Sequence, residues 1–121
     1  MKELPKSTKV VVIGGGVAGT SCAYHLAKFG WKDVILLERD QLTSGTTWHA
    51  AGLLGQLGAS STITKIRKYS LDLYKELEKI TGLSTGMKQN GAITVASTKE
   101  RMQELLRQAT TAQLSDVEVE V

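Results

Sequence analysis

Two apolar runs near the start of the chain predict a pair of buried strands. Residues 9–14 contain the run Val-Val-Val-Ile and residues 34–38 contain the run Val-Ile-Leu-Leu, each without a polar interruption. Short runs of this kind, with no apolar–polar alternation, are typical of parallel strands buried on both faces. Between them, residues 16–30 are compatible with a helix, for which Gly30 is a natural stop. The pattern therefore predicts a strand–helix–strand unit.

A loop and a long helix are predicted next. Residues 39–61 are dominated by Gly, Ser, Thr and Ala, which is typical of a loop and leaves room for one short helical turn. A long irregular stretch in a compact domain is usually functional. In residues 62–81, apolar side chains recur at helical spacing with charges between them, and Gly82 ends the pattern.

The last third of the chain predicts a strand, a helix and a second strand. Residues 92–96 form a short strand candidate, and residues 117–121 alternate apolar and acidic positions like a half-exposed strand. Between them, Ser97 and Glu100 have the spacing of a capping box that opens a helix. This strand–helix–strand segment is expected to belong to a second subdomain rather than to the sheet of the first two strands.

A glycine-rich segment joins the first predicted strand to its helix. It consists of Gly14-Gly15-Gly16-Val17-Ala18-Gly19, and the second strand ends in Glu38. In a dinucleotide-binding turn, Gly14 allows the tight turn, Gly16 lets the backbone approach a diphosphate, and Gly19 lets the helix lie close to the sheet. The helix N-terminus offers N–H groups to phosphates, and Glu38 is spaced to accept hydrogen bonds from ribose hydroxyls. A purely structural glycine turn is the alternative, but the flanking elements favour a nucleotide-binding unit.

Composition excludes several classes of partner. The chain has 121 residues, 41% of them apolar, so it can form one small core. Its net charge of +3 is dispersed, and only 5% of residues are aromatic, which does not suit a nucleic-acid groove. No segment resembles a membrane span or a signal peptide. Cys22 is the one cysteine and is expected to be buried; a cytoplasmic protein, or alternatively one of the mitochondrial matrix, is expected.

The loop after the second strand holds a more restrictive motif. Residues 44–53 are Ser-Gly-Thr-Thr-Trp-His-Ala-Ala-Gly-Leu. With the glycine turn, this segment resembles the FAD-dependent amine oxidoreductases of the sarcosine and dimethylglycine dehydrogenase group, within the D-amino-acid-oxidase-like superfamily. The likeness continues through residues 71–82 and 85–91 and fades after Gln113. It covers most of the chain but only the first part of a typical family member.

The resemblance implies an α/β fold: a Rossmann-like FAD-binding βαβ unit followed by the start of an α+β substrate subdomain. Residues 1–61 are expected to form the N-terminal part of the FAD-binding domain. Residues 62–121, a helix and the strand–helix–strand segment, are expected to begin the second subdomain. On this interpretation the chain is truncated, and the remainder of the enzyme, with the groups that hold the substrate, lies beyond Val121.

The resemblance also implies roles for individual residues. The histidine matching His49 is covalently bonded to the 8α-methyl carbon of the flavin, and a neutral imidazole is a good nucleophile near pH 7. The residues matching Val17 and Ala18 contact the diphosphate, and those matching Glu38 and Arg39 contact the adenosine end. The residues expected to line the flavin are Gly45, Thr46, Thr47, Trp48, His49, Ala50, Ala51, Gly52 and Leu53.

The reaction that the resemblance implies is oxidative demethylation of an N-methyl amino acid such as sarcosine or dimethylglycine. A hydride passes from the N-methyl group to FAD, and the resulting iminium is hydrolysed or passed to tetrahydrofolate in a C-terminal domain outside this chain. No electron acceptor is indicated. Four alternatives stay open: a His49 that only packs against Trp48, a glycine or D-amino acid oxidase with non-covalent FAD, a nicotinamide-dependent dehydrogenase sharing only the βαβ unit, and a regulatory paralogue without catalysis.

Overall fold

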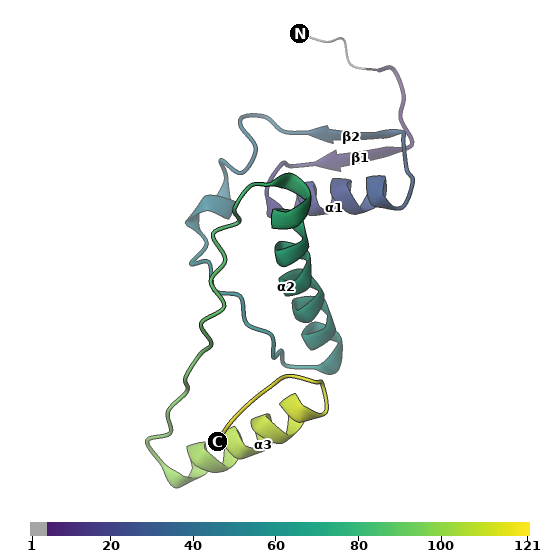
Figure 1. Cartoon of the computed structure of the whole chain (residues 1–121). Coiled ribbons are helices and arrows are strands. Elements are labelled where there is room, and N and C mark those ends of the chain that lie inside the picture. Colours follow the sequence, from purple (N-terminus) through teal and green to yellow (C-terminus); the bar gives the residue numbers. More distant parts are fainter. Residues whose placement is uncertain (1–4) are drawn as a thin grey trace. The chain divides into compact units, whose positions relative to one another are not determined.

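A computed structural model describes residues 5–121, which form two compact units divided between Leu53 and Leu54 (Figure 1). The first unit holds two strands, one α-helix and a 3₁₀ turn, and the second holds two α-helices. In chain order the elements are β1 (Val10–Ile13), α1 (Val17–Lys28), β2 (Val34–Leu37), η1 (Thr46–His49), α2 (Ser61–Thr81) and α3 (Lys99–Gln113).

The first unit is the βαβ arrangement that the sequence predicts. β1 and β2 pair in parallel, in a register that runs from Val10 opposite Val34 to Ile13 opposite Leu37. α1 connects them and packs against both strands (Figure 1). Each element ends within two residues of its predicted bounds, and the 3₁₀ turn η1 fills the place left for a short helical turn in the following loop.

One face of the two-stranded sheet is more exposed to solvent than predicted. The strands were expected to be buried on both faces, but exposure alternates along β1, where Val11 is 49% exposed and Ile13 is 85% exposed. Val12 lies toward α1, since its side chain is close to Gly19 of that helix. Among the described residues of this unit, α1 is the one α-helix, so it covers one face only. Cys22 of α1, expected to be buried, is also exposed because it lies on the helix surface.

The helices of the second unit begin and end at capping residues. Ser60 caps α2 by accepting a hydrogen bond from the Ile63 N–H at 3.3 Å, and Gly82 ends it in a left-handed conformation with φ +68°. The predicted cap of α3 is wrong by one residue. Thr98, not Ser97, has the extended backbone of a cap, and its hydroxyl accepts from the Arg101 N–H at 3.1 Å.

Small side chains form much of the core of the second unit. The apolar residues buried there are Leu71 of α2, Ala109 and Ala112 of α3, and Val117. Thr64 of α2 is 2% exposed and fully satisfied: its hydroxyl donates to the Ser60 carbonyl and accepts from the Gly58 N–H, both at 3.0 Å. Burial of a polar side chain is tolerated here because each polar atom has a partner.

The two strands predicted in the last third are wrong. Neither residues 92–96 nor residues 117–121 form a strand. Ile93 is 95% exposed, and no described strand pairs with it, so an extended segment lacks the ladder that makes it a strand. The chain turns back after α3 instead, and the Val117 N–H donates to the Ala112 carbonyl at 2.9 Å. The division of the chain into domains at residue 61 stays a prediction.

Candidate cofactor-binding site

The glycine turn between β1 and α1 is shaped by three close approaches. Gly14 has φ +100°, and its N–H donates to the Leu37 carbonyl at 2.8 Å, which ties the turn to the end of β2. A Cβ at Gly19 would collide with the Gly14 carbonyl oxygen, and one at Gly16 would lie 2.9 Å from the Thr47 hydroxyl. Because the obstruction at Gly19 is backbone, no rotamer change relieves it. The turn therefore needs glycine at position 14 for its positive φ and at position 19 for the backbone contact, and at Gly16 the atom in the way belongs to the Thr47 side chain.

The N-terminus of α1 is open to an anionic ligand. Gly16 caps it without a side-chain hydrogen bond, and its first turn holds no acidic residue. Val17 and Ala18 are exposed, and first-turn N–H groups have no carbonyl partner within their own helix. An uncompensated positive helix end beside a glycine turn is the arrangement that binds a diphosphate. The residues present therefore fit the diphosphate of FAD.

Glu38 follows β2, and its carboxylate supports the glycine turn. Its Oε2 accepts a hydrogen bond from the Gly15 N–H at 2.6 Å, and its Oε1 accepts from the N–H groups of Arg39 at 2.8 Å and Asp40 at 3.1 Å. The Gly15 hydrogen bond is the largest cause that lowers the pKa of Glu38 below its ordinary 4.5, so the carboxylate is ionised at neutral pH. One lone pair of Oε2 is left for a ribose hydroxyl.

The sequence analysis did not predict the contacts that Gly15 makes in the glycine turn. Gly15 is buried, and a Cβ there would lie 2.5 Å from Leu42 Cδ2 and 3.1 Å from Glu38 Cβ. Its carbonyl accepts from the Thr43 N–H at 3.0 Å. Gly15 is thus the point where the glycine turn, the acid after β2 and the following loop meet. The uninterrupted run of three glycines was the one signal in the sequence that its middle member is needed.

The loop after Glu38 returns to the glycine turn. Thr43 has φ +68°, an uncommon conformation for a residue with a side chain, and this bend turns the chain toward η1. Within η1, the Thr47 hydroxyl accepts a hydrogen bond from the Val17 N–H at 2.9 Å, across 30 residues of sequence. The structure therefore brings the predicted flavin-lining loop against the predicted diphosphate turn.

His49 ends η1 on the exposed side of this loop. Its Nδ1 lies 3.2 Å from the Gly45 carbonyl oxygen, and its ring lies against that of Trp48, with centroids 3.7 Å apart at 32°. A carbonyl oxygen only accepts, so Nδ1 is the donor, and Nε2 of a neutral ring carries the lone pair. Trp48 is fixed in turn by its Nε1–H, which donates to the Ser44 carbonyl at 3.0 Å. The Gly45 carbonyl and the Trp48 ring therefore hold the imidazole with Nδ1 directed toward Gly45.

The remaining predicted residues lie around this centre with fewer contacts. Arg39 is exposed and reaches the turn only through its backbone N–H to Glu38. Residues 50–53, which are Ala50, Ala51, Gly52 and Leu53, continue from η1 as an exposed segment in which Gly52 has φ +72°. Thr46 and Gly45 are exposed as well. Small exposed residues on both sides of His49 leave room for a flat ring to approach the backbone.

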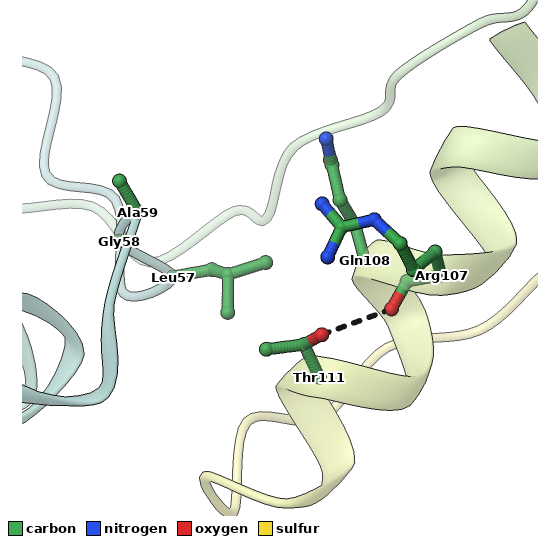
Figure 2. Close-up of a pocket in the computed structure, with 6 residues that line it drawn as sticks. All are labelled: Leu57, Gly58, Ala59, Arg107, Gln108 and Thr111. Carbon is green, nitrogen blue, oxygen red and sulfur yellow. Dashed lines mark hydrogen bonds between the residues drawn. The ribbon is translucent and has the colours of Figure 1, made fainter.

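A separate hollow of about 390 Å³ lies in the second unit, between residues 57–59 and α3 (Figure 2). Its one charged side chain, Arg107, is paired with Glu104 at 2.7 Å, and this guanidinium hydrogen bond lowers the pKa of Glu104 to about 2. Figure 2 shows the Thr111 hydroxyl bonded to the Arg107 carbonyl, at 3.0 Å. The Gln108 side chain also donates to Glu104, at 2.9 Å, so the polar side chains of the lining already have protein partners, and none belongs to the glycine turn.

The described part of the chain holds neither a membrane-spanning helix nor a metal-binding cluster. No helix of residues 5–121 combines the length and apolar character needed to cross a membrane. The same residues contain no cluster of three or more His, Cys, Asp or Glu side chains placed to hold a metal ion. Within that range the glycine turn and the loop that carries His49 are therefore the strongest candidate site.

Comparison with known proteins shows the family to which the chain belongs. The family model described as FAD dependent oxidoreductase, DAO, matches residues 9–121. The chain is 48% identical over 107 residues to the mitochondrial sarcosine dehydrogenase of Homo sapiens, and this match covers 88% of the chain and 12% of the dehydrogenase. It is 45% identical over 104 residues to the mitochondrial pyruvate dehydrogenase phosphatase regulatory subunit of Mus musculus, and this match covers 86% of the chain and 12% of the regulatory subunit.

A solved structure is similar as well. The crystal structure of glycine oxidase from Bacillus cereus ATCC 14579 matches with a TM-score of 0.63 and 30% identity, over 88% of this chain and 30% of that one. The chain thus spans about an eighth of the length of the sarcosine dehydrogenase and regulatory subunit that it matches. The family match covers nearly the whole chain, including the glycine turn and the loop that carries His49. The chain belongs to the FAD-dependent oxidoreductase (DAO) family.

Proposed function

We propose that this chain supplies the diphosphate-binding turn and the flavin-linking histidine of an enzyme that oxidatively demethylates an N-methyl amino acid, such as sarcosine or dimethylglycine. The observation that carries the proposal is the hydrogen bond between the Val17 N–H and the Thr47 hydroxyl, which joins the glycine turn to the loop that carries His49. The 48% identity to a sarcosine dehydrogenase supports the substrate class.

The groups that would hold FAD come from three segments of the first unit. Gly14, Gly16 and the N-terminal turn of α1 bind the diphosphate, because they combine a close backbone approach with the first-turn N–H groups of Ala18 and Gly19, which have no carbonyl partner in the helix. Glu38 accepts a ribose hydroxyl on the lone pair of Oε2 that the Gly15 N–H leaves open. The loop from Gly45 to Leu53 lies along the flavin, where its small residues permit close contact.

His49 anchors the flavin covalently in this proposal. Its Nε2 carries the free lone pair, since Nδ1 donates to Gly45. When FAD is bound, Nε2 of His49 would hold the flavin through a C–N bond to its 8α-methyl carbon, while the ring keeps Nδ1 directed toward the Gly45 carbonyl. The Trp48 ring and the Gly45 carbonyl hold the imidazole in one orientation before the bond forms.

The chemistry that FAD supplies when bound is acceptance of a hydride from the N-methyl carbon of the substrate. Groups that bind the substrate carboxylate, and any tetrahydrofolate that receives the one-carbon unit, belong to parts of the enzyme outside this chain. The electron acceptor is not assigned. The mitochondrial sarcosine dehydrogenase relative favours the matrix over the cytoplasm as the compartment of this protein.

Two measurements on the natively expressed protein test the proposal. Acid precipitation removes a non-covalent flavin, so a pellet that keeps its yellow colour and flavin fluorescence supports the His49 link. Anaerobic addition of sarcosine or dimethylglycine should then bleach the flavin absorbance of the folded protein. Loss of all flavin to the acid supernatant contradicts the covalent link, and an unchanged spectrum with both amines contradicts the substrate class.

Two alternatives have support of their own. The similarity to a glycine oxidase structure favours a non-covalent amino acid oxidase, which would release its flavin in acid and be bleached by glycine. The 45% identity to a regulatory subunit favours a paralogue without catalysis, which no amine would bleach. His49 weighs against the paralogue, since relatives of this family without catalysis tend to lose the flavin-linking histidine.

A further inference from the structure

We infer that Thr47 is a positioning residue, which sets the place of His49 relative to the diphosphate site through the hydrogen bond between its hydroxyl and the N-terminus of α1. The inference rests on the proposed function in one respect, the covalent attachment of the flavin through His49. It assigns a purpose to a side chain that would otherwise count only as part of the lining of the flavin.

Thr47 differs from its neighbours in the same turn. Thr46 and Trp48 are exposed, whereas Thr47 is half-buried against the glycine turn. Its hydroxyl oxygen accepts from the Val17 N–H at 2.9 Å. A Cβ at Gly16 would come within 2.9 Å of that oxygen. The absence of a side chain at Gly16 is therefore what lets the hydroxyl reach the helix end.

A second contact fixes the other end of the same segment. The Thr43 N–H donates to the Gly15 carbonyl at 3.0 Å. The five-residue segment from Thr43 to Thr47 is therefore held to the glycine turn at both ends. A segment held at two points has little freedom to shift or rotate, so η1 has a defined place relative to the N-terminus of α1.

The position of His49 follows from this attachment. The Ala50 N–H donates to the Thr47 carbonyl at 3.2 Å, and His49 Nδ1 lies 3.2 Å from the Gly45 carbonyl oxygen, so the imidazole is fixed within the turn that Thr47 anchors. Because Thr47 takes the Val17 N–H, the first-turn amides of Ala18 and Gly19 are left for the diphosphate. The distance from diphosphate to imidazole is thereby set by the protein before the flavin arrives.

Three substitutions in the natively expressed protein test the inference. Thr47→Val keeps the shape of the side chain but removes the acceptor, and Thr47→Ser keeps the acceptor with a smaller side chain. Thr110→Val is the matched control, because the Thr110 hydroxyl donates to the Leu106 carbonyl of its own helix, α3, at 3.1 Å, and belongs to the second unit.

Two readouts are measured for each variant. The first is hydrogen exchange of the Val17 amide in the apoprotein, which Thr47→Val should accelerate about tenfold, the size expected for loss of one neutral hydrogen bond. The second is the rate at which added FAD becomes resistant to acid precipitation, which Thr47→Val should slow about tenfold. Thr47→Ser should restore both rates, and Thr110→Val should change neither.

The outcomes separate the inference from the proposed function. Unchanged exchange of the Val17 amide in Thr47→Val overturns the inference, as does covalent attachment at the wild-type rate. Slowed attachment that Thr47→Ser does not restore also overturns it, because the hydroxyl would then not be the active group. If exchange accelerates but the wild-type protein releases all of its flavin in acid, the attachment of η1 to α1 is supported and the covalent link of the proposed function fails.

Discussion

Gly19→Ala is expected to force α1 away from β1 and thereby damage the candidate cofactor site. The added Cβ would collide with the Gly14 carbonyl oxygen and lie 3.0 Å from its carbon and 3.5 Å from Val12 Cγ1. The obstructing atoms of Gly14 are backbone, so the clash is relieved only if the helix moves by several tenths of an ångström or more. That movement would open the turn in which the diphosphate is expected to bind.

The loss of stability expected for Gly19→Ala is large because the obstructing Gly14 atoms belong to the backbone. Overpacking at a well-packed position costs about 1–3 kcal/mol, and a clash with backbone belongs at the upper end of this range. We therefore expect the free energy of unfolding to fall by about 3 kcal/mol. FAD affinity should fall about a hundredfold, because the diphosphate needs the undistorted turn and binding must then restore it at a cost of similar size.

Denaturant unfolding and FAD titration of the natively expressed variant measure these two quantities. Gly55→Ala is the control, because that glycine has an ordinary backbone conformation and no atom within 4 Å of the added Cβ. The control is expected to be as stable as the wild type, or slightly more stable, since alanine restricts the unfolded chain. A Gly19→Ala protein that unfolds and binds FAD like the control would refute the close packing of α1 on the turn.

The remaining predictions concern charge, capping and apolar surface. Glu38→Gln should weaken FAD binding about tenfold at pH 7, because the Gly15 N–H loses its charged partner. In the wild-type protein, the affinity for FAD, measured by flavin fluorescence, should be lost as the pH falls through the lowered pKa of Glu38. The contribution of the carboxylate to the Gly15 contact is fully present above the ordinary pKa of 4.5 and disappears on protonation. Thr98→Ala should lower the free energy of urea unfolding by about 1 kcal/mol, because the Arg101 N–H loses its partner. Residues 1–121 expressed alone should self-associate in size-exclusion chromatography and retain little FAD, because side chains such as Ile13, 85% exposed, stay uncovered; a monomeric, flavin-loaded protein would count against this.

The βαβ unit was predictable because its determinants are local. The apolar runs of β1 and β2 are unbroken, and the glycines at 14, 16 and 19 have the spacing that a strand–turn–helix requires. The structure places these elements within two residues of their predicted bounds. Gly82 likewise ends α2 as predicted, since a left-handed residue after a helix favours glycine regardless of tertiary context.

The errors arose where structure depends on partners rather than on pattern. Val11 and Ile13 have the composition of residues buried in a sheet, but burial needs a covering layer that composition does not supply. Residues 92–96 have strand-like composition, but a strand exists only when another strand pairs with it. At α3, Ser97 and Thr98 are both residue types that favour a helix N-cap, and the sequence pattern alone did not show that Thr98 takes this position.

The candidate site likewise combines features that could be predicted from the sequence with contacts that could not. The glycine turn and the acid after β2 were predictable from spacing, and the loop that carries His49 from its resemblance to a family. The contact of Thr47 with Val17, and that of Gly15 with Glu38, join residues 30 and 23 positions apart, and no pattern in the sequence encodes them. The chain reaches Thr47 only after the bend at Thr43, which is visible as a backbone conformation and not in the sequence pattern.

A crystal structure of the natively expressed protein with FAD would test the central claim most directly. The account predicts that the FAD diphosphate lies at the N-terminus of α1 against Gly14 and Gly16, with the His49 imidazole bonded to the dimethylbenzene edge of the flavin. A diphosphate bound elsewhere, or a flavin whose ring lies far from His49, would contradict it.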